Sequence, residues 1–141
     1  KNPNYGAADD AIIPFGNIKL SEYSNKIQVL QTYVGCEYPH MNESSRAALI
    51  KTYHSGTICT GDNRFNQFAE ECRQKNIPCY ICGAENREIY ESAKVFEEYG
   101  FTVLPPASFV SQYIKLWLCL SAGRDFKEIC NKSLGEDILK E

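Results

Sequence analysis

The hydrophobic pattern of this chain changes period several times between residue 25 and residue 131. Four segments are rich in β-branched, aromatic or small apolar residues and are bounded by turn-forming residues, which is typical of strands. The predicted strands are residues 26–34, 47–53, 77–82 and 101–104. The second of them breaks abruptly into small and polar residues from His54 onward, as a buried parallel strand does where it ends at a crevice.

Apolar residues at helical spacing separate the later strands. The predicted helices run from 61–63 to 75–76, from Asn86 to Gly100, from 108 to 120 and from 125 to 131. Strands and helices therefore alternate with short connections, which predicts a parallel sheet covered by helices on both faces. We expect a small Rossmann-like or flavodoxin-like three-layer α/β domain with about four parallel strands.

The domain organisation follows from where this pattern begins. In residues 1–24, Asn, Gly, Pro and Asp recur, which indicates an extended arm or interdomain linker. Residues 25–141 form one domain, long enough to bury a core. Because the chain does not begin with Met, we expect it to be part of a longer protein.

Composition and charge exclude several classes of function. The formal net charge is -3 and the basic residues are scattered, so no nucleic-acid partner is expected. The longest apolar run, Ile114 to Leu120, is interrupted by Lys115 and is far too short to cross a membrane. No signal peptide is visible. The 7 cysteines, an odd number mostly in apolar surroundings, indicate reduced thiols in a cytoplasmic protein.

Most candidate motifs have a structural explanation. Cys79 and Cys82 form a C-x-x-C, but residues three apart on a strand point to opposite faces, so we expect core cysteines. His40 and His54 are not at paired spacing, so no metal site is predicted. No Gly-rich nucleotide motif is present, and no cofactor is expected. The stripe Phe109-Tyr113-Trp117 indicates core or interface packing.

A series of segments resembles the C-terminal small domain of the L-asparaginase family, in particular of the cytosolic type I group. These segments are residues 29–35, 48–56, 76–80, 90–100 and 108–120, within a resemblance that covers roughly residues 25 to 121. Their order matches the strand-loop-strand, helix, strand, helix, strand, helix course of that domain. The resemblance implies that two threonines, an Asp and a Lys of a separate large domain hydrolyse L-asparagine to L-aspartate and ammonia. The small domain completes the active site of a neighbouring subunit and builds the dimer, and in some type I members it helps to form an allosteric asparagine site.

The resemblance also assigns candidate crevice residues, with departures from the family pattern. Lys51 occupies a position where a type I member uses Arg for effector binding, and Lys lacks the planar fork that grips a carboxylate. Thr57 stands where many members have an Asn that reaches the neighbour's site. His54 and Ser55 lie between them. Thr57 has no evident base nearby, so it is expected to line the crevice rather than act as a nucleophile, and no catalytic residue is predicted in this chain.

Three functional hypotheses follow. The first is the C-terminal domain of an asparaginase-type amidohydrolase, inactive alone, whose partners are its own N-terminal catalytic domain, further copies of the chain and a small amide or amino acid. The second is a regulatory module that binds a small amino acid in the same crevice. The third is the related amidotransferase subunit that releases ammonia for tRNA-linked glutamate. The preference between asparagine and glutamine, the oligomeric state and the survival of an effector site stay open.

Overall fold

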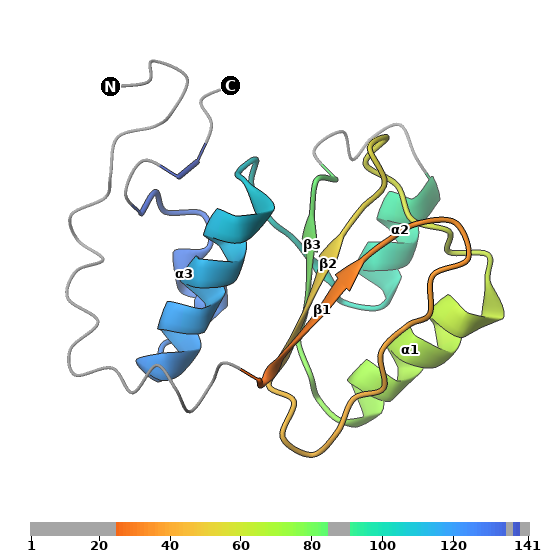
Figure 1. Ribbon diagram of the computed structural model, residues 1–141, viewed down its shortest axis with the longest axis horizontal. Helices are drawn as coiled ribbons and strands as arrows, with labels where there is room; N and C mark the ends of the chain where they lie inside the picture. Colours follow the sequence, from red (N-terminus) through yellow and green to blue (C-terminus); the bar gives the residue numbers. More distant parts are fainter. Residues whose placement is uncertain (1–24, 85–90, 135–136, 139–141) are drawn as a thin grey trace.

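Four parallel strands form the centre of the computed structural model, which describes residues 25–84, 91–134 and 137–138 (Figure 1). They are β1 (Ile27–Gln31), β2 (Ala47–Lys51), β3 (Cys79–Cys82) and β4 (Thr102–Val103), in the spatial order β1-β2-β3-β4. All neighbouring pairs are parallel, and the last residues of β1, β2 and β3 stand side by side in register. The predicted α/β fold with a small parallel sheet is therefore confirmed.

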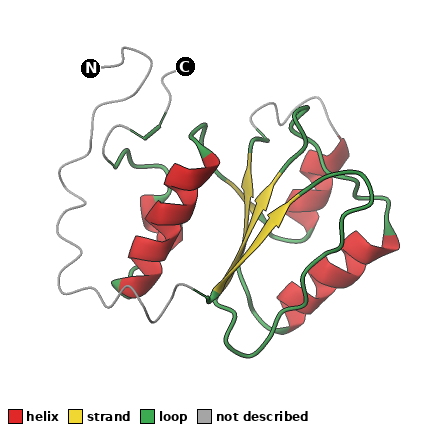
Figure 2. Ribbon diagram, viewed as in Figure 1, coloured by secondary structure: helices red, strands yellow, loops and turns green. Residues whose placement is uncertain are grey.

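Helices cover both faces of this sheet (Figures 1 and 2). α1 (Asn63–Gln74) connects β2 to β3, and α2 (Glu91–Glu98) connects β3 to β4. They share a face because right-handed crossovers that step in one direction across a sheet all lie on the same side. α3 (Phe109–Ser121) and the short α4 (Phe126–Ile129) follow β4 and cover the opposite face. Among the described residues, no helix combines the length and apolarity needed to span a bilayer.

Side-chain caps fix where three of these helices begin. The Asp62 side chain accepts a hydrogen bond from the Arg64 N–H, and the Ser108 side chain accepts one from the Ser111 N–H. Asp125 caps α4 in the same way. These caps satisfy backbone donors that would otherwise lack partners, so the helix starts predicted from sequence are confirmed.

The second predicted helix is described only from Glu91 onward. The predicted cap Asn86 and the apolar residue Ile89 lie outside the described residues, as do the arm of residues 1–24 and the last residues of the chain. Phe96 is 1% exposed, as its position on the predicted apolar face requires. The helix ends before Gly100, whose φ of 69° provides the predicted left-handed cap.

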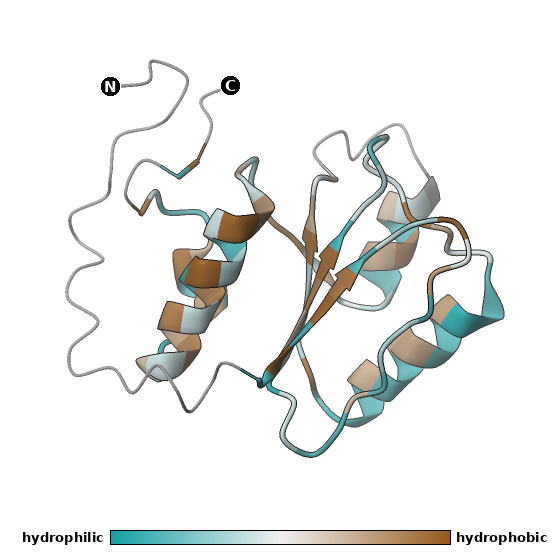
Figure 3. Cartoon of the chain, viewed as in Figure 1, coloured by the Kyte–Doolittle hydropathy of each residue, from teal (hydrophilic) through white to brown (hydrophobic). Residues whose placement is uncertain are grey.

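The sheet separates two apolar clusters, one under α1 and α2 and the other under α3 and α4. Figure 3 shows the hydrophobic strands running between the helices of the two faces. Cys79 belongs to the first cluster and Cys82 to the second, so the C-x-x-C thiols lie on opposite faces as predicted. All seven cysteines are free. This pair therefore fills two cores and forms neither a zinc site nor a redox dithiol.

Candidate functional site

Two threonines end the first two strands in the same way. The N–H and the hydroxyl of Thr32 both donate to the Lys51 carbonyl, at 3.1 and 2.7 Å. The N–H and the hydroxyl of Thr52 both donate to the Cys82 carbonyl, at 3.0 and 3.1 Å. Since a carbonyl only accepts, both hydroxyl hydrogens are committed. The two hydroxyl oxygens can therefore only accept hydrogen bonds from anything that lies above them.

A tight turn follows β2 and packs against the end of β3. The Tyr53 N–H donates to the Thr57 carbonyl at 2.9 Å, and the Gly56 N–H donates to the Tyr53 carbonyl at 2.9 Å. Gly56 has a φ of 80°, and a Cβ there would lie 2.9 Å from the Gly83 carbonyl oxygen. Only glycine fits both the left-handed backbone and this approach. The sequence change after β2 is thus explained by a closed turn whose apex is exposed.

A cavity of about 750 Å³ lies at the carboxyl ends of the strands. The turns after β1, β2 and β3 form its floor and walls, and the start of α3 closes it at Ala107 and Phe109. Aromatic and apolar side chains, Tyr33, Val34 and Tyr53 among them, contribute to its walls. The strand order does not reverse among the described strands. The cavity is therefore bounded by strand ends and a helix N-terminus rather than by a topological switch point.

The predicted site residues separate into two pairs. Lys51 and His54 line the cavity. Ser55 and Thr57 are not in its lining, and their hydroxyl oxygens are 2.8 Å apart and hydrogen-bonded to each other. A second hydroxyl is no general base, so this contact does not activate Thr57 as a nucleophile.

The thiol in the cavity wall is equally unreactive. Burial raises the pKa of Cys82 to about 12, and the nearby Lys51 ammonium only partly opposes this rise. Because the thiolate is the nucleophilic form, Cys82 is a neutral wall residue at physiological pH. In the part of the chain that the structure describes, no three His, Cys, Asp or Glu side chains are grouped so as to hold a metal ion.

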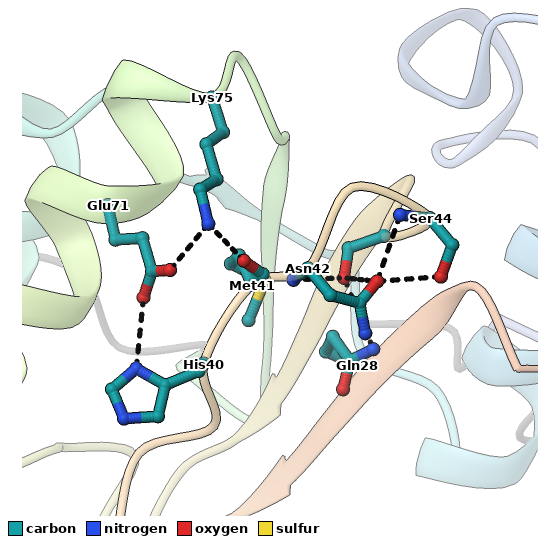
Figure 4. Close-up of polar contacts among 8 residues, drawn as sticks. Gln28, His40, Met41, Asn42, Ser44, Glu71 and Lys75 are labelled. Carbon is teal, nitrogen blue, oxygen red and sulfur yellow. Dashed lines mark hydrogen bonds and ion pairs between the residues drawn. The ribbon is translucent and has the colours of Figure 1, made fainter.

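A second hollow, of about 420 Å³, lies between the β1–β2 loop and α1. Figure 4 shows the polar contacts of two of its lining residues, His40 and Glu71, and of the neighbouring loop. Glu71 accepts from Lys75 Nζ at 2.8 Å and lies 3.5 Å from His40 Nδ1, and Lys75 Nζ also donates to the Met41 carbonyl. The Lys75 hydrogen bond is the main cause that lowers the pKa of Glu71. Because these groups satisfy one another around a loop whose Met41 is 1% exposed, their role is to fasten the loop to α1.

At pH 8, the native protein is expected to react quickly with a thiol reagent at Cys59 alone. Cys59 is exposed and the other six cysteines are buried. Burial raises the pKa of Cys119 to about 11 and of Cys82 to about 12, so their thiolate forms are scarce. Counting modified cysteines by mass spectrometry checks this, with all seven modified in denaturant. Several fast cysteines in the native protein would contradict the packing.

The same shifts set a pH dependence of stability. The thiol pKa values are higher in the folded protein than their ordinary value of 9.0. As the pH rises above that value, thiols ionise in the unfolded chain before they can do so in the folded one. The free energy of unfolding therefore falls above about pH 9, which urea titrations at pH 7 and pH 10 would measure.

The fold and the cavity define the class of protein: an α/β domain with a ligand-sized cavity at the carboxyl edge of its sheet. Comparisons with protein-family models, curated proteins and solved structures found no match.

Proposed function

We propose that this chain is the C-terminal domain of an L-asparaginase-type amidohydrolase and that its cavity binds a small amino acid or amide. The order of elements supports this proposal. Strand, loop, strand, helix, strand, helix, strand and helix follow one another in the course that the resemblance implies. The single observation that carries the proposal is the position of the cavity. It lies where the segment around Lys51 and His54 reaches the sheet edge.

The polarity of the cavity matches an α-amino acid. Thr32 and Thr52 line it, and their hydroxyl oxygens can only accept hydrogen bonds, which favours an ammonium or amide N–H. Lys51 supplies a cation for a carboxylate. The N-terminus of α3, at Phe109, adds the positive end of a helix dipole on the opposite wall. L-Asparagine carries an ammonium for the threonine oxygens, a carboxylate for Lys51 and an amide carbonyl oxygen for the N-terminus of α3.

On this proposal the domain does not hydrolyse its ligand. Among the described residues of the cavity, Cys82 is a protonated thiol, and the hydroxyl hydrogens of Thr32 and Thr52 are committed to backbone carbonyls, so no activated nucleophile is formed there. The hydrolysis of L-asparagine to L-aspartate and ammonia belongs to the threonines, Asp and Lys of a separate catalytic domain. This domain completes the site of a neighbouring copy. The exposure of Val34, 92%, and Tyr33, 63%, at the cavity supports a docked neighbour. The free, buried cysteines support a cytoplasmic location.

One observation favours the regulatory module as a second candidate. Four segments of this chain bound a cavity of about 750 Å³, which is large enough to bind a small amino acid without a catalytic domain. A free-standing sensor of a small amino acid would have the same cavity and no associated hydrolysis.

Two measurements on the same protein separate these proposals. Calorimetric titration with L-asparagine, L-glutamine and L-aspartate measures binding, and an ammonia assay measures hydrolysis. We expect asparagine binding without ammonia release from this chain, and ammonia release when it is expressed with the adjoining coding sequence. Ammonia from this chain alone would overturn the non-catalytic role. Binding without hydrolysis in both cases would favour the regulatory module, and absence of binding would contradict both proposals.

A further inference from the structure

A buried charge on α3 holds the C-terminal part of the chain. Lys115 lies in the most apolar helix and its side chain is 1% exposed. Its Nζ is 2.6 Å from Asp137 Oδ2 and donates to the Lys132 carbonyl at 2.8 Å. The other Asp137 oxygen accepts from the Leu134 N–H at 2.7 Å. A buried ammonium is tolerated only when it is paired and hydrogen-bonded, so these contacts tie one short segment to the helix.

This segment, which we call the C-terminal strap, comprises residues 132–134 and 137–138. It ends in a backbone contact with the cavity wall. Ile138 forms an antiparallel bridge with Ala107, which lines the cavity and directly precedes the Ser108 cap of α3. The ion pair at Asp137 is one residue from this bridge. Asp137 and Ile138, which are adjacent in the strap, therefore connect Lys115 on α3 to the cavity wall at Ala107.

The connection between β4 and α3, which contains Ala107, is also held by a buried side chain of α3. Gln112 is fully buried, and its Nε2 donates to the Pro105 carbonyl at 2.9 Å. The connection between β4 and α3 thus lies between a side chain of α3 and the strap. Removing the strap leaves the hydrogen bond between Gln112 and Pro105 intact and removes the bridge between Ile138 and Ala107. That arrangement suits a wall that shifts while the helix stays in place.

We propose that the C-terminal strap sets the width of the cavity, with Lys115 as the positioning residue that holds it. The inference rests on the proposed function only for the identity of the ligand. A buried ion pair contributes little net stability compared with apolar residues of similar volume, and in some proteins its role is to fix register. Here the register brings Ile138 opposite Ala107. Loss of the pair widens the cavity without unfolding the core.

Cys82 reports on this wall without any ligand. It lines the cavity and belongs to the core under α3, whereas Cys79 lies in the other core. We would compare Lys115→Met and Asp137→Asn with the parent protein, measuring N-ethylmaleimide labelling of each cysteine by peptide mass spectrometry. Each single variant leaves one buried charge without its partner, so the double variant Lys115→Met/Asp137→Asn, which removes both charges and retains an oxygen for the Leu134 N–H, is also compared and is expected to keep the fold.

The expected result is at least about tenfold faster labelling of Cys82 in these variants, with Cys79 unchanged. Lys132→Met is the matched control, because it removes an exposed charge from the strap while its carbonyl still accepts from Lys115. An unchanged Cys82 rate in the folded variants would overturn the proposal. Equal acceleration of Cys79 would also overturn it, since the strap would then contribute to global stability alone.

A ligand titration tests the proposed function separately. If the parent protein binds L-asparagine, Asp137→Asn is expected to weaken that binding while Lys132→Met does not. If the parent protein binds no amino acid, the proposed function fails. The labelling rates of Cys82 still decide whether the strap controls the cavity.

Discussion

Replacing Phe65 by alanine is expected to lower the free energy of unfolding by about 3–5 kcal/mol. Phe65 is 0% exposed and lies in the core between α1 and the sheet. Its ring contacts those of Tyr38, Tyr99 and Phe101 edge-on, with centroids 5.8 to 6.1 Å apart. The substitution therefore opens a cavity where the β1–β2 loop, α1 and the start of β4 meet. Urea unfolding followed by circular dichroism would measure the loss.

Tyr33→Ala is the matched control, because it removes an aromatic ring that is 63% exposed. Its expected effect on stability is within about 0.5 kcal/mol. If the free energy of unfolding fell by less than about 1 kcal/mol in Phe65→Ala, the surrounding rings would have moved into the space. Phe65 would then not be needed to hold α1 against the sheet.

The helix facing this core was predictable from sequence, because Phe65, Phe68, Ala69 and Cys72 repeat at helical spacing and all are buried. The strand ends were less predictable. The strands predicted at 26–34 and 47–53 end at Gln31 and Lys51. Each strand ends where the next residue, a threonine, donates its N–H and its hydroxyl to one carbonyl of the neighbouring strand. That neighbour is unknown until the strand order is known.

The cavity was predictable only in part for the same reason. Lys51 and His54 stand out because an apolar run breaks there. Thr32 and Ala107 come from segments far away in sequence, and only the parallel register brings them to the same edge. One signal was present: Thr-Tyr follows both β1 and β2, as Thr32-Tyr33 and Thr52-Tyr53. Read together, these pairs indicate two strands that end alike.

Lys115 shows a different limit. In the sequence it only interrupts an apolar run, which is equally typical of a lysine whose ammonium reaches water. The structure buries it because Asp137 and the Lys132 carbonyl come from the strap. Both partners are tertiary, and no spacing on α3 itself indicates them. Buried ion pairs of this kind are found by geometry rather than by pattern.

Reversing the charge of Lys51 is expected to weaken L-asparagine binding about 10- to 100-fold, a prediction that rests on the proposed ligand. A hydrogen bond to a charged partner contributes about 1.5–3 kcal/mol, which corresponds to that range in Kd. Lys51 ends β2 and lines the cavity beside the floor made by Thr52. In Lys51→Glu the new carboxylate repels that of the ligand. The side chain is exposed, so the fold is expected to survive.

Two further variants decide whether the charge acts locally. Lys94→Glu makes the same change of charge on an exposed residue of α2, on the opposite face of the sheet from α3, and should leave the Kd within about twofold. Lys51→Arg keeps the charge and adds a planar fork, so it should bind at least as tightly as the parent protein. Equal weakening by Lys51→Glu and Lys94→Glu would mean that only net charge matters and that the carboxylate does not lie at Lys51. Weakening by Lys51→Glu with retention by Lys51→Arg would locate the carboxylate at the end of β2. The ammonium would then lie over the threonine oxygens, which can accept hydrogen bonds but cannot donate them.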